Sequence, residues 1–196
     1  MENYKVIIGI FASVISVIGY IPYLRDILKK KTKPHVFSWL MWSLGAGIVF
    51  AAQIVKGAGP GAWVMGVAVV ISILITILAA FQGEKKITIT DWIAFGGSLL
   101  GLIAWILTSN PLLAVILITI SDALAFIPTF RKTYYKPYEE TLFTWLISSV
   151  KFIFVLFALD AYNATTLLYP IYLILSNSSF TIMMLARRKA LSKITD

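Results

Sequence analysis

The chain has 196 residues, of which 59% are hydrophobic and only 13% charged, and its mean hydropathy is +0.87. Soluble globular domains carry about 25% charged residues, so these values indicate an integral membrane protein. Cysteine is absent, which excludes disulfides, thiolate metal sites and cysteine nucleophiles, and the single histidine, His35, makes a histidine-based metal or acid-base site unexpected.

Seven apolar stretches follow one another along the chain, and each is close to the roughly 20 residues that a membrane-spanning helix needs. Short segments rich in glycine, proline, charged or capping residues separate them, as is typical of helix ends. The sequence therefore predicts an all-α membrane protein with seven transmembrane helices, at approximately 5–28, 35–55, 61–81, 90–108, 111–131, 140–160 and 163–186.

Lysine and arginine are distributed unevenly over the predicted connections. Fourteen of the 17 lie in the first, third and fifth connections and in the tail, including Lys85 and Lys86 between the third and fourth stretches. Because cytoplasmic loops retain positive charge, we expect a cell-membrane protein with its N-terminus outside and its C-terminus in the cytoplasm. This topology and anionic lipid headgroups account for the net charge of +8, so the bilayer is the expected partner and no nucleic acid is needed.

The chain contains an internal duplication at an offset of 106 residues. Residues 19–43 align with 125–149 without a gap, and eight of the 25 positions are identical: Ile21/Ile127, Pro22/Pro128, Arg25/Arg131, Lys30/Lys136, Phe37/Phe143, Trp39/Trp145, Leu40/Leu146 and Ser43/Ser149. In an apolar chain this pattern indicates two copies of a membrane unit around a shared centre.

The duplication also predicts the domain organisation. A first triple-helix bundle is expected at 1–82, a linker with the fourth helix at 83–110, and a second triple-helix bundle with a basic tail at 111–196. A single linker helix gives both copies the same orientation in the membrane, so the predicted arrangement is two parallel repeats joined by a linker, 3+1+3.

The repeated motif resembles that of a known clan. The sequence G-Y-I-P-Y-L-R at 19–25, followed by a basic loop and F-S-W at 37–39, is similar to the repeat of the PQ-loop, SWEET and SemiSWEET transporters. The second copy, A-F-I-P-T-F-R at 125–131 with F-T-W at 143–145, resembles it again, although Tyr23 and Thr129 replace the glutamine that follows the proline. The resemblance implies a small-solute transporter that works by alternating access.

Two residue pairs at equivalent positions are candidate hinge or gate residues. Pro22 and Pro128 each remove a helix hydrogen bond and bend the helix, which predicts paired hinges, with a static kink as the alternative. Trp39 and Trp145 begin the second and sixth predicted helices. Interface anchoring explains them, and the alternative is a role in the inner gate.

Asp122 and Lys151 are the charged residues deepest in the apolar stretches, each about 11 residues from the fifth connection. On antiparallel neighbouring helices they would reach a similar depth, so we expect them to meet near the midplane. A lone charge in hydrocarbon is costly, which predicts a partner or a polar cavity. The pair is interpreted either as a site for substrate and for proton coupling or as a structural ion pair.

Three further residues are candidate substrate ligands. Trp63 and Tyr169 occupy equivalent positions near the start of the third helix of each unit, where the resemblance places aromatic residues around the substrate. The alternative is membership of the aromatic belt at the membrane interface. Asn177 is expected to face the interior, where it would bind a ligand or bridge helices.

The leading hypothesis is a carrier of a small polar solute such as a sugar, an amino acid or a vitamin-like metabolite. The alternative is a receptor or adaptor that uses the same central pocket without transport. A retinal photoreceptor fits less well because the seventh helix lacks a lysine before its predicted cytoplasmic end. A membrane enzyme fits poorly because no nucleophile, base and orienting group can be assembled, so neither catalytic residues nor a cofactor are expected. A monomer could suffice, and homo-oligomers remain open.

Overall fold

The computed structural model of the chain describes residues 3–84 and 87–195, so the predicted basic residues Lys85 and Lys86 lie outside the described residues. Seven α-helices occupy these ranges: α1 (Asn3–Leu28), α2 (Val36–Val55), α3 (Trp63–Gln82), α4 (Ile89–Thr108), α5 (Pro111–Tyr135), α6 (Leu142–Ala158) and α7 (Ala164–Thr195). Two short 3₁₀ turns, η1 (Gly59–Ala62) and η2 (Pro137–Glu139), lie in the connections. Within the described ranges no strand occurs, and the prediction of an all-α chain is confirmed.

Several helices have the length and composition of membrane spans. Within residues 3–84 and 87–195, five helical segments are long and apolar enough to cross a membrane: α1, α2, η1 with α3, α5 and α7. Helix α6 is shorter, at 17 residues. These helices are those of a multi-pass membrane protein, while the predicted set of seven spans stays a prediction.

The bundle exposes many large apolar side chains and buries several polar ones within its hydrophobic core. Large aliphatic side chains such as Ile7, at 64% exposure, and Leu107, at 78%, point outward. Ser16, Gln53 and Asn177 are instead buried between the helices. A soluble protein would hide the first group and expose the second. This distribution suits a lipid environment.

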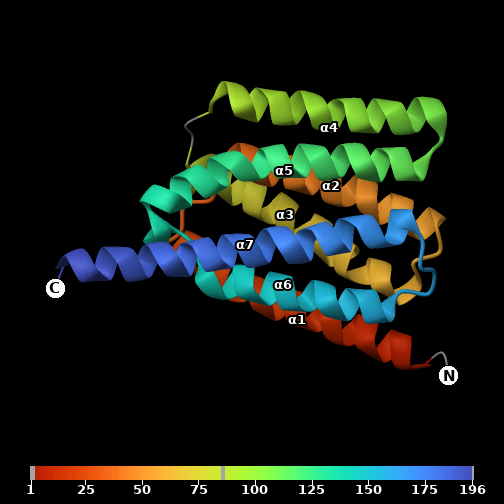
Figure 1. The fold of residues 1–196 in the computed structure, drawn as a ribbon, viewed down its shortest axis with the longest axis horizontal. Helices are drawn as coiled ribbons and strands as arrows, with labels where there is room; N and C mark the ends of the chain where they lie inside the picture. Colours follow the sequence, from red (N-terminus) through yellow and green to blue (C-terminus); the bar gives the residue numbers. More distant parts are fainter. Residues whose placement is uncertain (1–2, 85–86, 196) are drawn as a thin grey trace.

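Six helices surround a common centre, and α4 lies beside them. Helix α3 packs against both α1 and α2, and α7 packs in the same way against both α5 and α6. The two groups meet where α1 contacts α6 and where α2 contacts α5. Helix α4 packs on α5 and α2 at the edge of the molecule (Figure 1).

Helix starts follow the capping residues that the sequence places there. Asn110 Oδ1 accepts a hydrogen bond from the Leu112 N–H at 3.1 Å and so caps the first turn of α5. Asn163 Oδ1 accepts from the Thr165 N–H at 3.1 Å at the start of α7. Each asparagine satisfies backbone donors that the helix leaves free, which fixes where the chain turns.

Helix α7 is longer than predicted, since it continues to Thr195 beyond the expected limit near residue 186. Arg187 Nε donates to the Tyr134 carbonyl at 2.9 Å, and Arg188 Nη2 donates to the Glu140 carbonyl at 2.6 Å. These contacts hold the basic tail against the connection between α5 and α6, so it stays helical, and Figure 1 shows α7 extending past its neighbours toward the C-terminus.

The two ends of the bundle differ in their connections. We call the end formed by connections 29–35 and 136–141 the basic end, and the end formed by connections 56–62 and 159–163 the opposite end.

Candidate functional site

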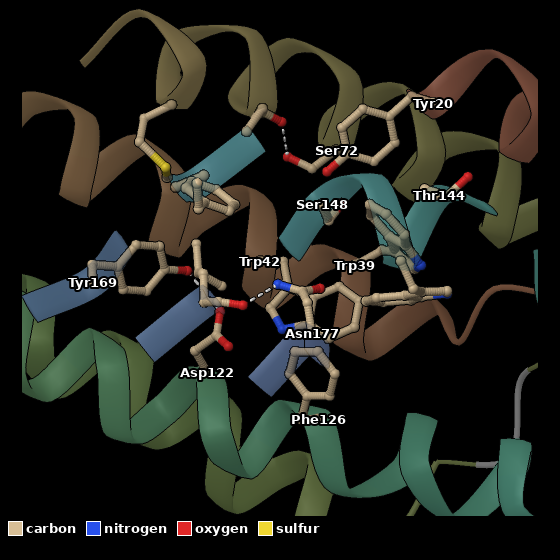
Figure 2. A pocket seen from close by; sticks show the side chains of 16 residues that line it. Tyr20, Trp39, Trp42, Ser72, Asp122, Phe126, Thr144, Ser148, Tyr169 and Asn177 are labelled. Carbon is tan, nitrogen blue, oxygen red and sulfur yellow. Dashed lines mark hydrogen bonds between the residues drawn. The ribbon is translucent and has the colours of Figure 1, made fainter. Parts of the chain in front are cut away.

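A cavity lies at the centre of the bundle and is lined by side chains from α1, α2, α3, α5, α6 and α7 (Figure 2). Its volume is about 70 Å³, which holds a few water molecules. The lining residues are Tyr20, Trp39, Trp42, Ala46, Met65, Ala68, Ser72, Asp122, Phe126, Thr144, Trp145, Ser148, Phe152, Tyr169, Leu173 and Asn177. Of these only Asp122 carries a full charge.

Aromatic rings close the cavity toward the basic end. The ring centroids of Trp42 and Phe126 are 4.9 Å apart, and those of Trp145 and Phe180 are 4.5 Å apart. Trp39 joins the same cluster. Trp39 and Trp145 are only 4% and 5% exposed, so they belong to the interior of the bundle. This burial argues against their interpretation as interface anchors and favours the gate interpretation.

Asp122 on α5 is held by two tyrosines of α7. Its Oδ1 accepts a hydrogen bond from the Tyr169 hydroxyl at 2.7 Å, and its Oδ2 accepts from the Tyr172 hydroxyl at 2.6 Å. The residue is 5% exposed. The spacing of Tyr169 and Tyr172 puts both hydroxyls on one face of α7, because residues three apart are neighbours on a helix. The carboxylate is therefore fixed in position with both oxygens occupied by neutral donors.

Lys151 lies elsewhere, which corrects the predicted contact with Asp122. Its Nζ donates to Ser16 Oγ at 3.0 Å and to the Tyr20 hydroxyl at 3.4 Å, and the residue is 1% exposed. Helix α7 packs between α5 and α6, so the two charged residues approach the centre from different sides. The assumption that consecutive helices are neighbours was wrong here.

The predicted aromatic pair is not brought together. Tyr169 is 2% exposed and lines the cavity, whereas Trp63 is 40% exposed and lies outside the lining set. The structure does not bring Trp63 to the cavity, because its side chain leaves α3 on the outer surface. Asn177 does line the cavity, and its Nδ2 donates to the Leu173 carbonyl of its own helix at 2.6 Å.

Helices α1 and α5, which contain the equivalent prolines Pro22 and Pro128, share a feature that the sequence analysis missed. The Ser38 hydroxyl of α2 donates to the Ala125 carbonyl of α5 at 2.7 Å, three residues before Pro128. The Thr144 hydroxyl of α6 donates to the Gly19 carbonyl of α1 at 2.7 Å, three residues before Pro22. These bonds, which we call the hydroxyl latches, join the two groups of helices next to each proline. Their only signal in the sequence is the hydroxyl at the middle of F-S-W and F-T-W.

A buried ionic cluster closes the basic end, and the sequence analysis missed it too. Glu140 is 2% exposed; its carboxylate accepts from Lys132 Nζ and, at 3.2 Å, from Trp145 Nε1. Lys33 pairs with Glu139 at 3.2 Å across the same end. The available signal was the presence of two acids in an otherwise basic connection.

The opposite end is closed by close backbone contact. The Asp160 N–H donates to the Ala58 carbonyl at 3.2 Å, which joins the α6–α7 connection to the α2–α3 connection. Lys5 also approaches the Asp160 carboxylate, at 3.4 Å. Gly59 has φ +59°, and a Cβ there would collide with the side chain of Asp160. Only glycine allows this turn, which seals the cavity from its second side.

Comparison of the chain with protein-family models, with curated proteins and with solved structures finds no match.

Proposed function

We propose that the protein is a carrier that moves a small polar solute across the cell membrane by alternating access. The observation that supports this most directly is the central cavity, which is lined by six helices, contains a buried carboxylate and lies between two ends at which the bundles contact each other. Solute sites in transporters built from repeats lie between the repeats near the membrane midplane. The N-terminus would lie outside and the C-terminus in the cytoplasm, as the basic residues indicate.

The proposal includes two parallel triple-helix bundles, α1 to α3 and α5 to α7, with α4 as the linker. The same packing pattern in both groups supports this arrangement. Equivalent residues also meet each other: Lys33 pairs with Glu139 at 3.2 Å, and the rings of Trp39 and Trp145 are 6.4 Å apart. Such contacts are expected along a twofold axis between two copies of one unit. Seven spans in a 3+1+3 arrangement fit the resemblance to the PQ-loop and SWEET clan.

Transport would require the bundles to separate at one end at a time, because the cavity of about 70 Å³ is too small for an organic solute. Pro22 and Pro128 would serve as the hinges, since a helix bends most easily where proline removes a hydrogen bond. The hydroxyl latches would hold both hinges while the cavity is closed. A latch that breaks on opening would couple the helix bend to the separation of the bundles.

The chain lacks cysteine, so introduced cysteines can test alternating access directly. Ala46→Cys places a thiol in the cavity wall, and a charged, membrane-impermeant methanethiosulfonate is applied to oriented vesicles from either side. We expect labelling from both sides. Leu100→Cys on the outer surface of α4, in the middle of the helix and at 63% exposure, is the matched control and should remain unlabelled in lipid.

Two disulfide locks sharpen the test. Lys33→Cys with Glu139→Cys closes the basic end, and Ala58→Cys with Asp160→Cys closes the opposite end; each pair is joined by a backbone hydrogen bond of 3.2 Å. Each lock is combined with Ala46→Cys, and its disulfide is formed by oxidation before labelling. Labelling of Ala46→Cys should then occur only from the side of the membrane at the unlocked end. Labelling from one side only in the unlocked protein, or labelling that neither lock changes, would contradict the proposal and favour a receptor.

A further inference from the structure

Lys151 and Asp122 carry opposite charges, but the duplication places them at two different contacts between the bundles, so they do not pair. Lys151 and Ser16 face each other between α6 and α1, with Nζ and Oγ 3.0 Å apart. At the offset of 106 residues the equivalent positions are Gly45 and Asp122, on α2 and α5. The lysine thus faces a serine at one contact between the bundles, whereas the residue that corresponds to the lysine at the other contact is a glycine. Because glycine has no side chain, the first bundle supplies no cation for Asp122 at this position.

The surroundings of Asp122 leave its charge without a basic partner in the cavity wall. Both carboxylate oxygens accept hydrogen bonds from neutral tyrosine hydroxyls. Among the described residues that line the cavity there is no lysine, arginine or histidine. A buried carboxylate is costly unless a positive group lies close by. A cationic group of a bound molecule would satisfy this requirement.

The rest of the cavity wall favours the same kind of group. Trp42, Phe126 and Trp145 present aromatic rings to the cavity, and the face of an aromatic ring attracts a cation. Asp122 and Phe126 are four residues apart on α5 and so share one face of that helix, and the ring centroids of Phe126 and Trp42 are 4.9 Å apart. Aromatic rings also provide flat apolar area for the carbon skeleton of a ligand.

We propose that the transported solute carries an amine or other organic cation, which pairs with Asp122 while its carbon skeleton lies against Trp42 and Phe126. This inference rests on the proposed function, since it names the class of solute for the same cavity. Lys151 does not oppose it from the cavity wall. Its Nζ lies 4.4 Å from the centre of the Tyr20 ring and donates a hydrogen bond to Ser16. Neither Lys151 nor Ser16 is among the residues that line the cavity.

The test compares three probes with one carbon skeleton: 2-phenylethylamine, 2-phenylethanol and phenylacetate. Binding to the detergent-purified full chain is measured by tryptophan fluorescence, because Trp39, Trp42 and Trp145 line the cavity. We expect the amine to bind at least tenfold more tightly than the alcohol, and phenylacetate to bind more weakly than either. Asp122→Asn should remove the preference for the amine. Asp160→Asn, the same chemical change outside the cavity, should leave it intact.

A second variant covers the case in which Asp122→Asn does not fold. Gly45→Lys places a lysine at the position equivalent to Lys151, where it can pair with Asp122 from the first bundle. A Cβ at this position would lie 3.0 Å from Ile118 Cγ2, so any side chain here should lower the unfolding temperature somewhat. We expect Gly45→Lys to lose amine binding. Gly45→Met, similar in length but uncharged, should retain the amine preference over the alcohol.

The outcomes separate this inference from the proposed function. Equal binding of amine and alcohol, tighter binding of phenylacetate, or an amine preference that survives Asp122→Asn or Gly45→Lys would overturn the cation assignment. None of these results would affect the accessibility test of transport. Loss of two-sided labelling of Ala46→Cys would instead overturn the carrier, whatever the binding data show.

Discussion

Helices α1 and α5 each contain a proline at an equivalent position, and in each a hydroxyl from the other bundle reaches the carbonyl three residues before it. The two bundles differ in their charged and polar residues. Asp122 and Asn177 of the second bundle correspond to Ser16 and Ile71 of the first. Duplicated positions thus carry the contacts between bundles, while unmatched positions carry the chemistry of the cavity. A ligand in such a cavity meets two unlike walls.

The largest effect on stability is expected at the equivalent residues Trp39 and Trp145, whose indole N–H groups have different hydrogen-bond partners. Trp145→Ala should lower the free energy of unfolding by about 3–5 kcal/mol, because it empties a packed aromatic cluster. It also leaves the Glu140 carboxylate without its bond from Nε1, which measures 3.2 Å. Trp39→Ala loses a bond of the same length to the neutral Tyr23 hydroxyl and should cost less. Denaturant titration in detergent measures both. An equal or larger loss for Trp39→Ala would contradict this ranking.

A new carboxylate in the first bundle should stabilise the protein relative to a neutral side chain of similar shape. Ser16→Asp places a carboxylate next to Lys151, whose Nζ lies 3.0 Å from the serine oxygen. The buried lysine then gains a charged acceptor, and because a hydrogen bond to a charged group contributes about 1.5–3 kcal/mol, we expect Ser16→Asp to exceed Ser16→Asn in free energy of unfolding by about that amount. Ser16→Asn is the control of similar shape without the charge, and should give no such gain. A lower stability for Ser16→Asp than for Ser16→Asn would show that Lys151 needs no anion.

The hydroxyl latches should differ modestly in strength. Thr144→Val removes one buried hydrogen bond and should cost about 1 kcal/mol. Ser38→Ala should cost about 1–3 kcal/mol, because Thr129 Oγ1 also donates to Ser38 Oγ at 3.0 Å and would lose its acceptor. The unfolding temperature of each variant measures this difference, with Ser43→Ala, whose hydroxyl bonds within α2, as control. Identical costs for the two latches would contradict the ranking.

The smallest effect is expected at the mismatched aromatic pair. Trp63→Phe should change the affinity for 2-phenylethylamine by less than twofold, because Trp63 is 40% exposed and lies outside the cavity. Tyr169→Phe removes a donor to Asp122 and should change this affinity more. Fluorescence titration of both variants provides the comparison. A larger change in affinity for Trp63→Phe than for Tyr169→Phe would indicate that Trp63 contacts the ligand.

The positions of the helices could be read from the sequence because each apolar stretch has the length of a membrane span and ends at residues that cap or break helices. Asn110 and Asn163 act as such caps in the structure. The limit of α7 was missed because its extension depends on Arg187 and Arg188, which bind carbonyls of a distant connection. Local sequence cannot contain that information.

The sequence by itself determined an all-helical membrane chain, the duplication, and three residues of the cavity wall, Asp122, Tyr169 and Asn177. Polar residues inside apolar helices face inward whatever the arrangement, because lipid does not solvate them. Only the tertiary structure decided which residues meet. With α7 between α5 and α6, Asp122 is bound by Tyr169 and Tyr172, and Lys151 by Ser16 and Tyr20. Depth along a helix follows from residue number, whereas contact depends on which helix faces pack together.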